Sequence, residues 1–301
     1  MSRTVLDIQQ SDFLLNGTPT MQGRIWNGHR MEGLLPNCRM VQGIFNDLNP
    51  LTRDRWDYPD GPWDADRNTD AFVAAMPEWR AHGLLGFTLN LQGGSPEGYS
   101  REQPWINSAF APDGSLRSDY FCRLARIPEQ ADRLGMAVIL GLFYFGQEPR
   151  MESDAAIRRA AAGAVDWLLG CRDRHVLIEV ANETDLPHYR SGLFQDTGAA
   201  DMIRSLQEYS RGRVDNRAGR LYVGTSFSGG TLPGPGVTEV SDLLLIHGNG
   251  VNTPAGLTDL IRNTRALPAF RGQPVVVNED DHTQFEHADN HFIAATREHA
   301  S

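Results

Sequence analysis

The chain has 301 residues, with 38 acidic and 28 basic side chains and a formal net charge of −10. This acidic balance argues against nucleic acid or an anionic membrane surface as the main partner. All 28 basic residues are arginine. The lack of lysine excludes Schiff-base and pyridoxal-phosphate enzymes, P-loop nucleotide hydrolases and kinases, all of which need a lysine amine.

The cysteines and the N-terminal residues indicate where the protein works. Cys38, Cys122 and Cys171 are far apart and form no CxxC pair or zinc-ligand set, so we interpret them as buried or incidental thiols. The first ten residues lack a signal-peptide pattern, and no apolar run approaches 18 residues. We therefore expect a cytoplasmic protein with no membrane partner, unless a leader has been removed.

Short apolar runs alternate with helical patterns along most of the chain. Residues 12–18 contain Asn16-Gly17, a signal for a two-residue hairpin turn. Several of the later runs are continuously apolar, which is typical of parallel strands covered on both faces. The predicted strands are Met40–Phe45, Leu84–Leu89, Ala137–Leu142, Val176–Val180, Leu221–Thr225, Leu243–His247 and Val275–Asn278.

Amphipathic helical patterns lie between these strands. The first places Phe72 and Trp79 on one face but contains Pro77, and the second contains Pro128, so we expect a kink or a break in both. In the third, Ser153 is a candidate N-cap. Residues 226–242 are rich in glycine and proline, which predicts an irregular fifth crossover.

This alternation predicts an α/β fold built from βαβ units. No GxGxxG follows the first strand, so we favour a (β/α)8 TIM barrel over an open nucleotide-binding sheet. Residues 1–39 would form a leading hairpin segment and residues 40–301 the barrel. Seven strands are identified. The eighth is missing or replaced, because the chain stops at Ser301 where it should begin, so the leading segment or a partner would have to cover the open edge.

The chemistry of a barrel lies in the loops at the carboxyl ends of its strands. These loops are rich in amides, aromatic rings, carboxylates and histidine, a set that suits sugars, whose hydroxyls need polar partners and whose C–H faces stack on rings. The predicted substrate-binding residues are Asn46, Asn90, Trp105, Tyr144, Asn182, His247 and Asn249. Tyr99, Trp56 and Trp63 are either stacking platforms or loop anchors.

Two carboxylates are the main catalytic candidates. Glu183 ends the fourth strand and Glu279 the seventh, and these strand ends face each other across a barrel mouth. Glycoside cleavage with retention needs two such groups about 5–5.5 Å apart, one as acid and one as nucleophile. Glu179 lies inside the fourth strand, and we interpret it as structural.

Two segments resemble the clan A retaining glycoside hydrolases, the superfamily that includes the family 5 cellulases. Ile178–Glu183 (IEVANE) is similar to their strand-four Asn-Glu signature, and Pro274–Glu279 (PVVVNE) to their nucleophile segment. The leading hairpin Phe13–Gly17 also resembles the one that precedes many of these barrels. The strand order agrees over residues 10–300.

The resemblance implies a role for each matching residue. Glu183 would be the acid/base and Glu279 the nucleophile that forms a covalent glycosyl intermediate. Asn182 would hold the 2-hydroxyl of the sugar, and His247 would orient the nucleophile or the substrate. The strand-eight tryptophan of the family has no counterpart. The implied substrate is an oligosaccharide or glycoside with a β-linkage, and we expect no cofactor and no metal.

Two other functions stay open. The first is a metal-dependent barrel hydrolase or isomerase, whose ligands would come from Glu183, Asp185, His247, Glu279, Asp281 and His282. Against it, no His-x-His follows the first strand. The second is a catalytically inactive barrel that only binds carbohydrate.

Overall fold

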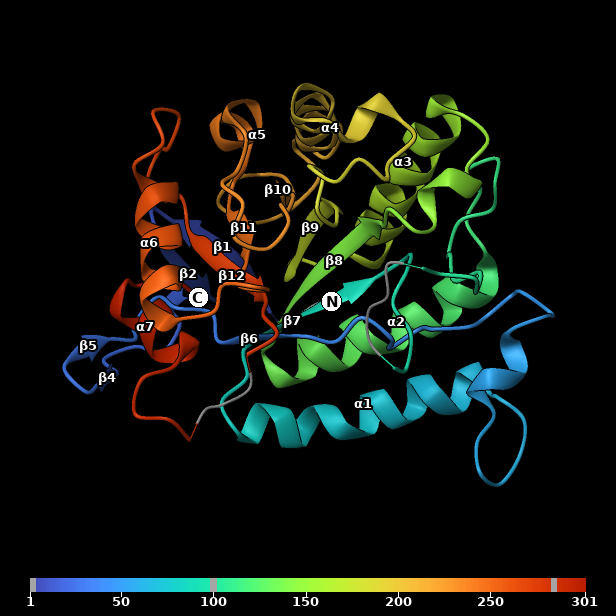
Figure 1. Ribbon diagram of the computed structural model, residues 1–301, viewed down its shortest axis with the longest axis horizontal. Coiled ribbons are helices and arrows are strands. Elements are labelled where there is room, and N and C mark those ends of the chain that lie inside the picture. The colour runs from blue at the N-terminus through green and yellow to red at the C-terminus, as the bar shows by residue number, and fades with distance from the viewer. Residues whose placement is uncertain (1–3, 98–101, 283–285) are drawn as a thin grey trace.

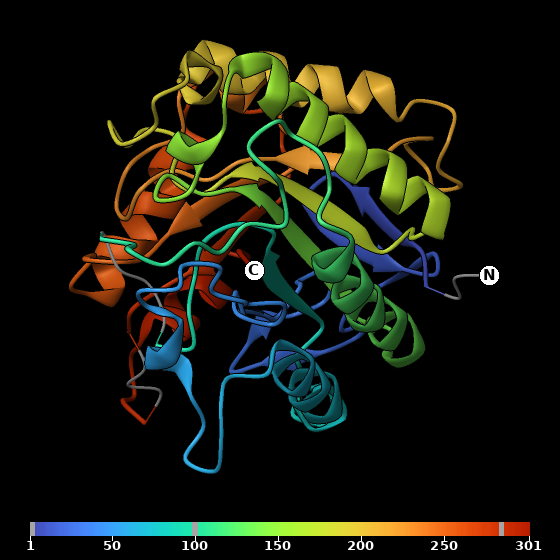
Figure 2. The same ribbon diagram turned by 90° about the vertical axis from the view of Figure 1, so that its right-hand side faces the viewer.

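The computed structural model describes residues 4–97, 102–282 and 286–301, so Tyr99 lies outside the described residues. A parallel array of strands runs through the centre, with helices on the outside (Figures 1 and 2). Strands β6 to β10 form one sheet in chain order. A bridge between Ser226 and Leu245 continues it to the β11–β12 pair. The strands are β6 (Asn37–Arg39), β7 (Gly86–Asn90), β8 (Ala137–Phe143), β9 (Val176–Ala181), β10 (Tyr222–Gly224), β11 (Leu244–His247) and β12 (Val275–Glu279).

Six of the seven predicted strands are confirmed, and the first is displaced. The apolar run Met40–Phe45 forms a turn after β6 rather than a strand. The side chains of Val41, Ile44 and Phe45 are buried there. A buried apolar turn therefore has the same sequence pattern as a buried strand, and the prediction mistook one for the other. The strand itself has the polar sequence Asn-Cys-Arg. Residues 37–39 fall in the predicted leading segment but pair with β7.

The leading residues close the amino end of the barrel. Strands β1 (Leu6–Gln9), β2 (Asp12–Leu15) and β3 (Thr18–Pro19) form an antiparallel sheet. Its turn at Asn16-Gly17 has φ values of 53° and 78°, as a two-residue hairpin requires. Leu6 and Phe13 share a buried cluster with Ala137, Leu177 and other residues near the strand starts. The hairpin thus acts as an apolar plug.

The helices follow the predicted order and cover the outer face. The prolines at 77 and 128 lie within continuous helices, so the expected break is absent at both positions. The predicted cap Ser153 accepts a hydrogen bond from Ala156 N. The fifth crossover contains one short helix, α5. The helices are α1 (Ala65–Ala81), α2 (Ser118–Leu134), α3 (Asp154–Cys171), α4 (Asp196–Tyr209), α5 (Pro235–Val240), α6 (Pro254–Arg265) and α7 (His291–Arg297). No helix in the described ranges is long and apolar enough to cross a membrane.

Ser301 lies between β12 and the segment that precedes β6, where an eighth strand would run. Ser301 N donates to Val275 O, and Val277 N donates to Ser301 O, which is the bonding of one residue in a parallel ladder. Leu35 N, just before β6, donates to Ser301 Oγ at 2.8 Å. Beyond Ser301, a cavity of about 300 Å³ separates β12 from β6.

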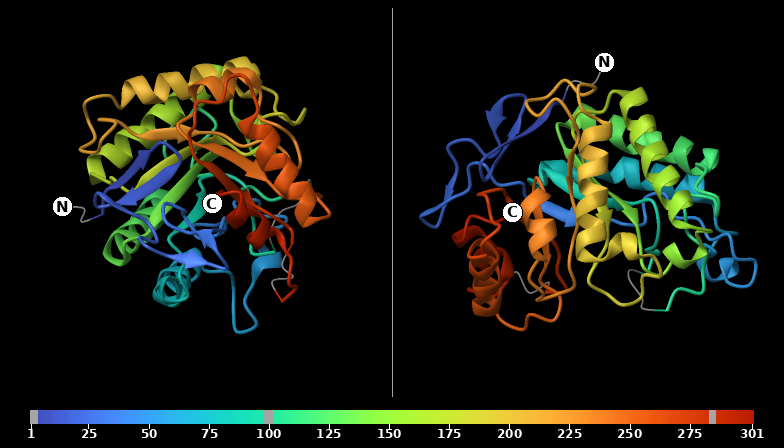
Figure 3. Two further views of the ribbon diagram at one scale, coloured as in Figure 1. Left: turned by 90° about the vertical axis from the view of Figure 1, so that its left-hand side faces the viewer. Right: turned by 90° about the horizontal axis from the view of Figure 1, so that it is seen from above.

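Helix α7 and a second hairpin flank this region. Strands β4 (Ile25–Trp26) and β5 (His29–Arg30) lie beside α7 (Figure 3). The rings of Trp26 and Phe292 meet edge to face, with centroids 6.4 Å apart. The chain therefore covers part of the seam with its own leading and closing segments.

Candidate active site

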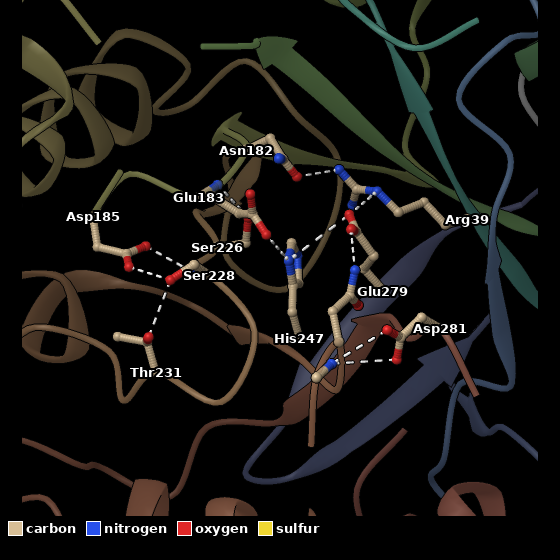
Figure 4. A network of polar contacts seen from close by, with 12 residues as sticks. Arg39, Asn182, Glu183, Asp185, Ser226, Ser228, Thr231, His247, Glu279 and Asp281 are labelled. Carbon is tan, nitrogen blue, oxygen red and sulfur yellow. Dashed lines mark hydrogen bonds and ion pairs between the residues drawn. The ribbon is translucent and has the colours of Figure 1, made fainter. Parts of the chain in front are cut away.

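Glu183 stands immediately beyond β9 in a strained backbone conformation. Its φ of 55° lies in the left-handed region, which is uncommon for a residue with a Cβ. Glu183 N donates to Ser226 Oγ at 3.0 Å, and Thr184 N donates to Ser226 O at 3.0 Å. Ser226, just after β10, thereby fixes the turn from which the Glu183 side chain points toward His247 (Figure 4).

Glu279 ends β12 and lies opposite Glu183. The β11–β12 register shifts between Ile246 and His247, so that His247 pairs with Glu279. His247 Nδ1 lies 3.0 Å from Glu183 Oε1 and 3.8 Å from Glu279 Oε2. One oxygen of each carboxylate and one His247 nitrogen all lie within 4.8 Å of one another. The two predicted catalytic carboxylates are thus close enough to act on one bond.

Arg39 is the site residue that sequence reasoning missed. Its Nε lies 2.8 Å from Glu279 Oε2, its Nη1 lies 3.4 Å from Glu179 Oε2, and its Nη2 donates to Asn182 Oδ1. The side chain is 7% exposed, and that of Glu179 is fully buried. One guanidinium therefore organises three residues from two strands. The sequence analysis missed Arg39 because it placed the first strand at Met40–Phe45. A single arginine in a polar tripeptide has no periodic pattern that would indicate a strand.

The environments of the two candidate carboxylates differ. Glu279 faces the Arg39 guanidinium and also accepts a 2.6 Å hydrogen bond from Asn249 Nδ2. This ion pair and this hydrogen bond stabilise the negative charge that a nucleophile needs. Glu183 instead contacts His247, with 14% of its side chain exposed. The pair is asymmetric, as acid and nucleophile roles require.

Asn182 is held from both sides. Its side chain accepts from Arg39, and its carbonyl oxygen accepts from the Tyr189 hydroxyl. Burial, reinforced by the charges of Glu179 and Glu183, raises the pKa of Tyr189 well above its usual value. The hydroxyl therefore keeps its proton and remains a donor at neutral pH.

The remaining predicted residues lie in two places. Asn90 is buried in the barrel interior beside Gly141, whose lack of a side chain makes room for both Asn90 and Glu179. Tyr144 packs under Gly93 and is 2% exposed.

Trp105 is also 2% exposed and packs with Phe45 and Trp56 in a separate aromatic cluster. Asn46 N donates to Asn107 Oδ1 next to this cluster. The structure thus brings Glu183, Glu279, Asn182, His247 and Asn249 together. It places Asn46 in the loop that follows β6 and Trp105 in the loop that follows β7.

Glu183, His247 and Glu279 could also hold a metal ion, as the metal-dependent alternative expects. Glu183, His247 and Glu279 have a suitable spacing, whereas Asp185 bonds Ser228 and Asp281 bonds Gly250 N. However, Arg39 already neutralises Glu279. Arg39 Nε lies 2.8 Å from Glu279 Oε2, so a metal ion at this carboxylate would have to compete with a guanidinium already in place.

The fold is the TIM-barrel-like fold of glycoside hydrolase family 5. The chain is similar to an endo-1,4-β-mannanase from Rhizomucor miehei, with a TM-score of 0.57 and 13% identity over 94% of this chain and 83% of that one. It is also similar to a family 5 mannosidase from Rhizomucor miehei, with a TM-score of 0.53 and 12% identity over 93% of this chain and 74% of that one. The sequence matches no protein-family model and no curated protein.

Proposed function

We propose that the protein is a retaining glycoside hydrolase that cleaves a β-linked glycoside by double displacement. The observation that carries this proposal is the closeness of Glu183 and Glu279, whose oxygens approach within 4.8 Å at the carboxyl ends of β9 and β12. An inverting enzyme needs a wider gap of about 6.5–9.5 Å, to leave room for a water.

In the first step Glu279 attacks the anomeric carbon, and Glu183 gives its proton to the departing glycosidic oxygen. A covalent glycosyl ester on Glu279 results. In the second step Glu183, now ionised, takes a proton from water, and the water oxygen displaces Glu279 from the anomeric carbon. The sugar leaves with its original configuration, and both carboxyl groups return to their starting states.

The surrounding residues have defined tasks in this mechanism. Arg39 and Asn249 hold Glu279 and stabilise its charge when the ester breaks. His247 contacts both carboxylates and fixes their relative position. Asn182, oriented by Arg39, presents its amide to the sugar 2-hydroxyl. The mannanase and mannosidase with this fold make aryl β-mannosides the first substrates to test, with β-glucosides beside them.

The test is removal of the nucleophile. We expect Glu279→Ala to lower the hydrolysis of an aryl β-glycoside by about a thousandfold or more, and added azide to restore part of the rate. The matched control is Glu239→Ala, which removes an exposed glutamate on α5 and should keep the wild-type rate. An unchanged rate in Glu279→Ala would show that Glu279 is not the nucleophile. No turnover of any glycoside by the wild type would favour the inactive carbohydrate-binding barrel.

A further inference from the structure

A second cluster of histidine and carboxylate lies directly behind the proposed active site. Asp280 and His282 follow β12, and His291 is the first residue of α7. The His282 and His291 rings lie 4.0 Å apart between centroids and are tilted by 32°. Both rings turn Nδ1 toward the same carboxylate, with distances of 2.8 Å to Asp280 Oδ1 and 2.7 Å to Oδ2. The three side chains therefore converge on one point.

No arginine takes part in this cluster. In the described part of the chain, the ion pairs of Asp280 are with His282 and His291 alone. Asp281 Oδ1 adds a second carboxylate oxygen 2.8 Å from His282 Nδ1. The cluster thus gathers negative charge and imidazole nitrogens without the permanent cation that neutralises Glu279.

We propose that Asp280, His282 and His291 bind one divalent transition-metal ion of the zinc type. The donors would be the Nδ1 atoms of both histidines and one Asp280 oxygen, the N₂O set that zinc prefers. One candidate ligand atom from each residue lies within 4.8 Å of the other two. Tetrahedral zinc with bonds of 2.0–2.1 Å separates its ligands by about 3.3 Å, so the side chains need only small movements to admit the ion.

The burial of His291 is the second observation that indicates a ligand. Its side chain is 4% exposed, and its Nε2 is buried with no hydrogen-bond partner. The neutral ring can carry its proton on this unpartnered Nε2, which leaves the Nδ1 lone pair facing the cluster for a metal ion. A metal–nitrogen bond at Nδ1 is stronger than the hydrogen bond it would replace. The cavity between β12 and β6, which is lined by all three residues, gives the ion access.

The proposed ion would have a structural role. It would tie the residue that follows Glu279 to the start of α7, and so fix the end of β12 from the side opposite Arg39. Asp280 also packs against Gly248, where a Cβ would touch its carboxylate. The proposal does not depend on glycoside hydrolysis, because none of the three residues belongs to the carboxylate pair.

The experiment is zinc titration of the full-length, EDTA-stripped protein by calorimetry, with Co²⁺ absorption as a report on ligand geometry. We expect one zinc per chain, a zinc-dependent rise in Tm, and a loss of affinity of about a hundredfold in Asp280→Asn and in His282→Ala. His282 is 27% exposed, so this variant should fold even if the variant at the more buried His291 does not.

The matched control is His287→Ala, which removes an exposed histidine near the cluster. It should bind zinc as the wild type does. Absence of stoichiometric zinc binding by the wild type would overturn the proposal. So would equal affinity in the wild type and Asp280→Asn, or a loss in His287→Ala as large as that in His282→Ala.

Discussion

Glu279 and Asp280 are consecutive in the sequence, yet they belong to two clusters of opposite character. Glu279 meets Glu183, His247 and the guanidinium of Arg39, whereas Asp280 meets two histidines and no arginine. Both clusters have the spacing of a metal site. The comparison teaches that residue types and distances alone do not decide between acid–base chemistry and metal binding. We infer that the fixed cation, Arg39, makes the difference.

The largest effect should follow removal of that cation. We expect Arg39→Met to lower kcat by about a hundredfold or more, because Glu279 loses its ion-pair partner and Asn182 its orientation. The control is Arg30→Met, which breaks an exposed pair with Asp12 and should leave kcat unchanged.

The same change also leaves Glu179 buried without its ion-pair partner, which destabilises the fold. The double variant Arg39→Met/Glu179→Gln should therefore recover Tm but not kcat. Recovery of both would mean that Arg39 acts only on stability.

A second prediction concerns the metal selectivity of the two clusters. If Arg39 keeps a divalent cation away from Glu279, the Arg39→Met variant should bind a second zinc ion. Its ligands would be Glu183, His247 and Glu279. Calorimetry should then give two zinc ions per chain in place of one. One zinc ion per chain in both the wild type and the Arg39→Met variant would contradict the proposal that Arg39 keeps a divalent cation away from Glu279.

The smallest effect concerns Asp173, a carboxylate that pairs with neither an arginine nor a histidine in the described residues. In the described residues Asp173 has no ion-pair partner, and burial, together with the charge of Asp132, raises its pKa to about 6. Its ionised form is penalised in the fold, so stability falls as the pH rises from about 4 through 6. We expect Asp173→Asn to gain about 1–3 kcal/mol at pH 7 and nothing below pH 4.

Urea unfolding at both pH values measures this gain. Asp215→Asn, at an exposed position, is the control and should change little. An equal gain at pH 4 and pH 7 would show that the effect of Asp173→Asn is not electrostatic.

The positions of Glu183 and Glu279 at two facing strand ends were predictable from the sequence, because the signal for each is local. Glu183 and Glu279 each follow a short apolar run, and the order of these runs placed the two strand ends across a barrel mouth. The leading hairpin was also predictable, since Asn16-Gly17 specifies its turn, but its packing against the strand starts was not. These features depend on patterns that lie within a few residues of one another.

The parts that were missed depend on tertiary contacts. Asn37–Arg39 has no apolar period, and Arg39 is held by polar partners inside the barrel, so neither β6 nor Arg39 could be recognised. His291 lies eleven residues beyond Asp280, and only the packing of α7 against β12 brings the two together. Likewise, no pattern shows that Ser301 bonds both β12 and the segment before β6.

The most direct test of the carboxylate pair is the anomeric configuration of the glycosyl azide that Glu279→Ala forms from an activated aryl β-glycoside. With the nucleophile removed, azide enters the space of Glu279 on the face opposite the leaving group, and NMR should show the α-azide. A β-azide would place the nucleophile elsewhere and assign Glu279 the acid/base role, contradicting the mechanism proposed for the two carboxylates.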